Sequence, residues 1–179
     1  PFLDAEELER FVGHRGVVVV DARPGRAYRR GHVPGAVHLE WTELVEGVGG
    51  PARGVQDSSF EAMAELLGGR GLTVEDWVIV VGDPLEYWGE EGRIAWALTL
   101  LGQRRVSVLD GGWSTWLKEG RPVQRGRVVL PPAVYRPAVD EAVLARKEDV
   151  QDFSRAATEW SHVLVDVREP AEFRGAPDA

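Results

Sequence analysis

Residues 17–25 read Val17-Val18-Val19-Val20-Asp21-Ala22-Arg23-Pro24-Gly25, four β-branched residues followed by a turn-forming stretch. An apolar run without polar alternation is typical of a strand buried on both faces, as in the middle of a parallel sheet. Residues 77–81 and 106–109 are two further, mostly apolar runs. We therefore predict parallel strands at these three positions.

The segments between these runs have the spacing of helices. Apolar residues at helical intervals predict helices over 3–11, 58–69, 93–101 and 113–117, a helical turn at 26–30, and loops at 46–56 and 82–92. A further short strand is expected at 36–41. Strands that alternate with helices indicate an α/β fold, a parallel sheet with helices on both faces.

The composition limits the classes of function. The chain has 179 residues, of which 44% are hydrophobic and 28% are charged, and a formal net charge of -8. An acidic chain of ordinary hydrophobicity is expected to fold into a core and to bind neither nucleic acid nor an anionic membrane surface. It has no apolar run of membrane-spanning length, and its first ten residues are acidic, so we predict a cytoplasmic protein.

The 179 residues include no cysteine. This excludes disulfides, cysteine-ligated metals and a thiol nucleophile within them. The four histidines (His14, His32, His38 and His162) are too dispersed to form a metal site, and the glycine-rich stretches match no nucleotide-binding pattern. We therefore predict no metal and no organic cofactor.

A pattern near the start of the chain recurs 145 positions later. Residues 19–23 (VVDAR) reappear as residues 164–168 (LVDVR), and the aromatic Tyr28 reappears as Phe173. The proline- and arginine-rich stretch between the copies is expected to be an extended connector. We predict a first domain at 1–123, a linker at 124–138 and the start of a second copy of the domain at 139–179, incomplete within these residues.

Four stretches of the first domain are distinctive: VVDAR at 19–23, GHVPGA at 31–36, VSVLDGGW at 106–113 and WLKEGRPV at 116–123. In this order and spacing they resemble the rhodanese family, in particular its tandem-domain sulfurtransferases. The resemblance implies transfer of a sulfane sulfur from thiosulfate or 3-mercaptopyruvate to a thiophilic acceptor such as cyanide. The carrier in that family is a cysteine persulfide at the head of the loop that follows a strand, and the two domains pack on each other.

In this chain Gly82 stands at the position of that cysteine. The resemblance implies that the first domain is the non-catalytic copy and that the cysteine lies in the second copy, beyond residue 179. The alternative is a catalytically silent rhodanese-like module that binds a partner. A phosphatase of related fold would also need a loop cysteine.

The resemblance also suggests pocket residues. Tyr87 and Trp88, in the loop after Gly82, could wall the substrate pocket or only fill the interface between the domains. Glu172 stands where mercaptopyruvate-type relatives often have an arginine, which favours thiosulfate as the donor, although it could equally be a solvated helix charge.

The pairs Asp21–Arg23 and Asp166–Arg168 follow the ends of the two repeated strands. Active sites of α/β folds lie at this place, so the pairs are candidates for chemistry. Because the pair occurs in both copies and only one copy would be catalytic, we favour a structural role, in which each pair ties a strand end to the next loop.

Overall fold

The computed structural model describes residues 2–46, 55–56, 59–156, 163–168 and 170–175. It divides into two compact units, Pro1–Val143 and Leu144–Ala179, which are described separately. Within the described residues, no helix is long and apolar enough to cross a membrane.

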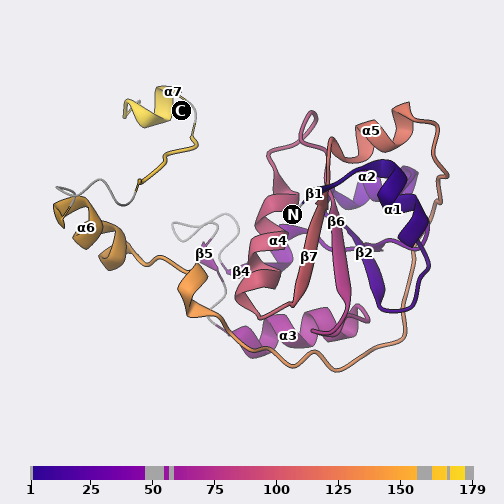
Figure 1. The fold of residues 1–179 in the computed structure, drawn as a ribbon, viewed down its shortest axis with the longest axis horizontal. Coiled ribbons are helices and arrows are strands. Elements are labelled where there is room, and N and C mark those ends of the chain that lie inside the picture. The colour runs from indigo at the N-terminus through magenta and orange to yellow at the C-terminus, as the bar shows by residue number, and fades with distance from the viewer. Residues whose placement is uncertain (1, 47–54, 57–58, 157–162, 169, 176–179) are drawn as a thin grey trace. The chain divides into compact units, whose positions relative to one another are not determined.

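Five parallel strands form the sheet of the first unit, in the order β1-β7-β6-β2-β3 (Figure 1). Their bounds are Phe2–Leu3 (β1), Val17–Asp21 (β2), Val37–His38 (β3), Trp77–Val81 (β6) and Arg105–Leu109 (β7). The two apolar runs at 17–21 and 77–81 are paired with each other in the interior of the sheet. The predicted α/β fold with a parallel sheet is therefore confirmed.

Helices cover both faces of this sheet. They are α1 (Ala5–Phe11), α2 (Gly25–Arg30), α3 (Phe60–Gly69), α4 (Glu90–Leu100) and α5 (Gly112–Lys118), with short helices η1 (Trp41–Leu44) and η2 (Glu141–Val143) and a small hairpin of β4 (Val45–Glu46) and β5 (Val55–Gln56). Val18 and Val20 of β2 share one core with α3 and α4, whereas Val19 shares a second core with α1 and α5. Because neighbouring strand residues point to opposite faces, an unbroken apolar strand supplies both cores.

The first helix begins later than predicted. Leu3 pairs with Leu109 as part of β1, so it is a strand residue and not a helical one. Asp4 then caps α1, because its carboxylate accepts the backbone N–H of Glu7 at 2.7 Å. The prediction was wrong at Leu3 because β-pairing with a distant strand leaves no local signal.

Two other boundaries also differ from the prediction. The strand expected at 36–41 is only Val37–His38, because Glu40 caps the short helix η1 and turns the chain away from the sheet. The helix expected at 93–101 begins at Glu90, directly after Gly89, whose φ of +82° favours glycine.

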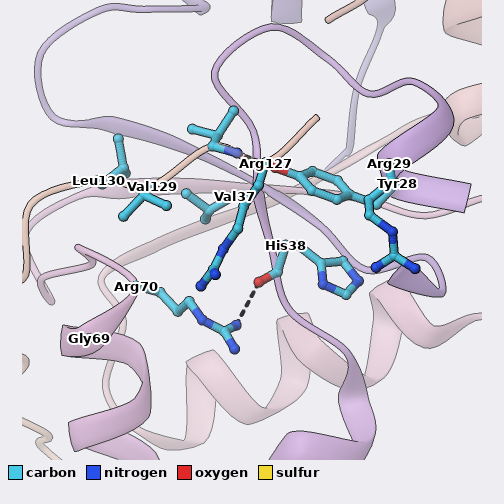
Figure 2. A pocket seen from close by; sticks show the side chains of 10 residues that line it. Tyr28, Arg29, Val37, His38, Gly69, Arg70, Arg127, Val129 and Leu130 are labelled. Atoms are coloured by element: carbon cyan, nitrogen blue, oxygen red, sulfur yellow. Dashed lines mark hydrogen bonds between the residues drawn. The ribbon is translucent and has the colours of Figure 1, made fainter. Parts of the chain in front are cut away.

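Residues 124–138, the predicted linker, form no helix and contain a single bridge, between Gln124 and His32. They run along the first unit: the backbone N–H of Ala133 donates to Gly68, and Tyr135 is buried in the core between α3 and α4. Together with α2, β3 and the end of α3, this connector lines a pocket (Figure 2). Its packing places it with the first unit, which extends to Val143.

The second unit contains helices α6 (Lys147–Ala156) and α7 (Pro170–Phe173). The strand predicted at 163–165 is not formed, and its three apolar side chains are exposed. A strand needs a neighbour to satisfy its backbone groups, and no described residue of this unit supplies one.

Tyr28 connects the connector to the first unit. Its buried hydroxyl donates to the carbonyl of Ala36 and accepts the N–H of Val128, both at 2.9 Å. We expect Tyr28→Phe to lower the free energy of unfolding by about 1–3 kcal/mol, because it leaves both groups without this partner. Urea denaturation measures the loss, and amide exchange at Val128 should become faster.

Tyr87→Phe is the matched control, since the Tyr87 hydroxyl has no hydrogen bond to any described residue. Equal losses in the two variants would contradict the assigned role of Tyr28.

Candidate functional site

The carboxyl ends of three neighbouring strands meet at one edge of the sheet. Asp21 ends β2, His38 ends β3, and Gly82 and Asp83 follow β6. Ligand sites of open α/β sheets lie at this edge, so we take it as the candidate site of the first unit.

A buried ion pair closes the end of β2. The Arg23 guanidinium donates to both carboxylate oxygens of Asp21, from Nε at 3.0 Å and from Nη2 at 2.6 Å, and the backbone N–H of Arg23 also donates to Asp21. Asp21 is 0% and Arg23 3% exposed. Arg23 further donates to the carbonyl of Gly31 at 2.7 Å and lies over the ring of Trp113. The pair thus holds the strand end, the loop after α2 and helix α5 together.

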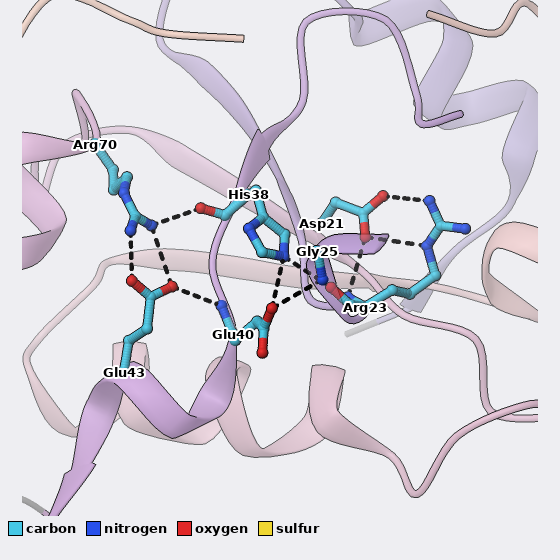
Figure 3. A network of polar contacts seen from close by, with 7 residues as sticks. All are labelled: Asp21, Arg23, Gly25, His38, Glu40, Glu43 and Arg70. Atoms are coloured by element: carbon cyan, nitrogen blue, oxygen red, sulfur yellow. Dashed lines mark hydrogen bonds and ion pairs between the residues drawn. The ribbon is translucent and has the colours of Figure 1, made fainter. Parts of the chain in front are cut away.

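A second set of polar contacts extends from this pair toward α3 (Figure 3). The His38 imidazole lies 2.9 Å from the carbonyl of Arg23, and Glu40 accepts the backbone N–H of Gly25. Arg70, which caps the end of α3, donates to the carbonyl of His38 and pairs with Glu43. These contacts join β3, η1 and α3, and two of the residues, His38 and Arg70, also line the pocket beside the connector.

The loop after β6 is held close to the start of α5. The carbonyl of Gly82 accepts the N–H of Trp113 at 2.8 Å, and Asp83 accepts the Ser114 hydroxyl at 2.9 Å. Gly112 has a φ of +59°, and a Cβ there would lie 2.5 Å from the Gly82 carbonyl oxygen. Only glycine therefore allows this close approach.

The space beside Gly82 is filled by a side chain from α4. A Cβ on Gly82 would lie 2.0 Å from Oε2 of Glu91, which reaches the loop from the first turn of α4. Glu91 is 8% exposed, and its Oε2 has no hydrogen-bond partner among the described residues. Burial raises the pKa of the Glu91 carboxyl, and the nearby charges of Glu90 and Asp83 raise it further.

The structure separates the two aromatic residues predicted to wall a pocket. Tyr87 lines a cavity of about 360 Å³ together with Arg23, Arg30, Asp83 and Trp113. Trp88, 90% exposed, lines another cavity with Trp41 and Arg93. Glu172 lies in α7 of the second unit.

The side chains of this site can hold the surrounding loops in place, but none of them can carry sulfur, because the chain has no cysteine. The titratable side chains of the site are carboxylates, guanidiniums, the His38 imidazole and the Tyr87 phenol, and no described residues form a cluster of three or more potential metal ligands. The sequence analysis missed Glu91, Asp83 and Ser114. The only local signal was the acidic pair Glu90 and Glu91 at the end of the loop. The spacing of the sequence does not indicate that the side chain of Glu91 is buried.

The second unit contains an Asp–Arg pair like that of the first, although the residues before it, 163–165, form no strand. The Arg168 backbone N–H and Nε donate to Oδ1 of Asp166 at 3.0 and 2.9 Å, and Nη2 donates to Oδ2 at 2.6 Å. Each distance matches its counterpart in Asp21–Arg23 within 0.1 Å. Here the pair is solvent-accessible, and the hydrogen bonds from Arg168 lower the pKa of Asp166 to about 2.

Comparison with known proteins places residues 4–119 in a single family, the Rhodanese-like domain. The chain is 31% identical over 175 residues to a thiosulfate sulfurtransferase of Corynebacterium glutamicum, a match that covers 97% of this chain and 56% of the relative. It is 32% identical over 151 residues to the sulfur carrier protein TtuD of Thermus thermophilus, covering 83% of this chain and 50% of that protein.

Among solved structures, the 3-mercaptopyruvate sulfurtransferase SseA of Escherichia coli matches with a TM-score of 0.81 at 25% identity. The match covers 99% of this chain and 69% of that one. The chain therefore spans about half the length of the curated relatives it matches.

Asp21→Asn tests the buried pair. It should lower the free energy of unfolding by about 3–5 kcal/mol, because it leaves the Arg23 charge buried and uncompensated. Asp166→Asn makes the same chemical change in an exposed pair and should have little effect, since solvent screens it. Urea denaturation compares the two, and equal effects would refute the proposed difference.

Glu91→Gln tests the buried carboxyl. With a raised pKa in the folded state, the native protein binds a proton more tightly than the unfolded chain, so wild-type stability should fall as pH rises from the ordinary glutamate pKa through the raised one. The variant cannot ionise, so it should be more stable than wild type at neutral pH, and the difference should vanish in acid. Unfolding from about pH 4 to about pH 8 measures this.

Glu86→Gln removes an exposed carboxyl from the same loop and controls for a general loss of negative charge. If wild type and Glu91→Gln have parallel pH profiles, the ionisation of Glu91 does not affect folding.

Proposed function

The chain belongs to the rhodanese family, and from this we propose that it is the leading part of a tandem sulfurtransferase. The proposed reaction moves a sulfane sulfur from thiosulfate to a thiophilic acceptor such as cyanide. Relatives that carry the name thiosulfate sulfurtransferase support this activity. The protein's donor and acceptor would be small molecules, and the cytoplasm stays our prediction for its location.

The observation that carries the proposal is the repeated Asp–Arg pair. Asp21–Arg23 lies at the end of β2 in the first unit. Asp166 and Arg168 are also two residues apart and form the same hydrogen bonds between the same side-chain atoms. A local motif reproduced atom by atom supports a second rhodanese copy that begins near residue 139 after the first domain and its linker.

The reaction needs a thiol that these 179 residues do not contain. In the proposed first step, a cysteine thiolate attacks the outer sulfur of thiosulfate, the S–S bond breaks, and its electron pair leaves with sulfite. In the second step, cyanide attacks the outer sulfur of the persulfide, thiocyanate leaves, and the thiolate is restored. Splitting the transfer at a covalent carrier is the usual advantage of nucleophilic catalysis.

We assign the thiolate to the second copy, at the place that corresponds to Gly82. In the first copy the Glu91 carboxyl occupies that place, which supports a scaffolding role for the first unit. Tyr87 and Trp88 remain the proposed contacts of this unit with the substrate pocket or with the second copy. The acidic Glu172 favours thiosulfate over 3-mercaptopyruvate as the donor.

The experiment is a mass measurement on the protein extended through its second copy. After incubation with thiosulfate, the protein should gain one sulfur atom, and cyanide should remove that atom as thiocyanate. The 179-residue chain is the control and should gain nothing, because it has no thiol. Replacement of the second-copy cysteine by serine should abolish the gain.

A second copy without cysteine, or a cysteine that acquires no sulfur, would favour the alternative of a catalytically silent binding module. The lack of cysteine in the present residues is the observation on which that alternative depends.

A further inference from the structure

A pocket on the first unit, away from the loop after β6, gathers positive charge. It encloses about 290 Å³ between α2, β3, the end of α3 and the connector (Figure 2). Its ten lining residues include Tyr28, Arg29, His38, Arg70 and Arg127. Three are arginines and none is acidic, in a chain whose formal net charge is -8.

Two of the three guanidiniums are available for a ligand. Arg29 and Arg127 make no side-chain hydrogen bond or ion pair with any described residue. Arg70 is already engaged by Glu43 and by the carbonyl of His38, which fixes it at the pocket wall. Glu40 is also close, because its carboxylate and the Arg29 guanidinium approach the same side of Gly25. The three arginines and the two acids Glu40 and Glu43 therefore leave a local formal charge of about +1.

Several contacts hold the aromatic wall of the pocket in place. Tyr28 is buried, stacks on His38 at a ring distance of 4.9 Å, and accepts the backbone N–H of Val128. The His38 imidazole lies 2.9 Å from the carbonyl of Arg23 and 3.6 Å from the carboxylate of Glu40. Arg29 and Arg127 extend from backbone segments on the two sides of this stack.

We propose that this pocket binds a small divalent oxyanion of tetrahedral shape, such as sulfate, thiosulfate or phosphate, between Arg29 and Arg127. A planar guanidinium donates two parallel hydrogen bonds to such an anion, and a pair of them matches its two charges. A volume of about 290 Å³ is at the small end of ligand pockets, which excludes most larger ligands. The inference does not depend on the proposed sulfur transfer.

Binding would also act on the connector. Arg127 belongs to the connector, whereas Arg29 belongs to α2, so an anion held by both joins the two segments. A ligand that binds only the folded arrangement stabilises it, and the free energy gained grows with the logarithm of the ratio of ligand concentration to dissociation constant. The same anion should therefore slow amide exchange along residues 127–130.

Titration calorimetry of the 179-residue chain tests the proposal, with sodium sulfate, thiosulfate and phosphate as separate probes and with ionic strength held constant by chloride. We expect saturable binding of one anion per chain that chloride does not reproduce. Arg29→Gln and Arg127→Gln should each weaken binding about tenfold, the effect of losing one charge-assisted contact. Arg26→Gln removes the same charge from the same helix outside the pocket and should leave the affinity unchanged.

The outcomes separate cleanly. If Arg26→Gln and Arg29→Gln weaken anion binding equally, the anion responds to the overall positive charge of the surface and occupies no defined site, which would overturn the proposal. The absence of saturable binding by all three probes would also overturn it. A preference for the sulfur anions or for phosphate supports the site and identifies its ligand. If Arg127→Gln lowers the urea midpoint and loosens the connector, Arg29→Gln decides, because Arg29 contacts the connector through its backbone carbonyl, which accepts the N–H of Gly126 and stays in the variant.

Discussion

The bidentate contact between Asp21 and Arg23 fixes the geometry on which the first unit depends. A carboxylate at the end of a central strand would be costly to bury alone, and the guanidinium two residues later compensates it without leaving the interior. The Arg23 guanidinium also donates a hydrogen bond to the carbonyl of Gly31 and lies over the ring of Trp113. One pair thus orients the loop into β3 and the helix that follows β7. Such pairs add little net stability compared with apolar substitutes, and their effect is to favour one arrangement over others.

The sequence was a good guide wherever the signal was continuous and local. The unbroken apolar runs at 17–20 and 77–81 identified the interior strands, because burial on both faces removes polar residues from consecutive positions. Leu3 was misassigned because its partner, Leu109, lies more than a hundred residues away. The strand expected at 163–165 has the right composition, but it lacks described neighbours that would make it a strand. Composition thus specifies the tendency to pair, and tertiary context decides whether pairing occurs.

Only part of the candidate site could be predicted from the sequence. Gly82 could be singled out from the sequence, since the order of the motifs along the chain leads to the loop after β6. The carboxyl that fills the space beside it could not, because Glu91 lies nine positions further on and reaches back across the start of a helix. The first unit therefore has a buried carboxyl in the space that any side chain at position 82 would need.

The connector has a consequence for where the first unit ends. Residues 124–143 are packed onto it by backbone hydrogen bonds to Gly68, Leu100 and Leu101, and by the burial of Tyr135. A chain cut after α5 would lose these bonds and uncover the apolar surface that Tyr135 shields. The autonomous folding unit is therefore longer than its secondary-structure elements suggest, and it reaches Val143.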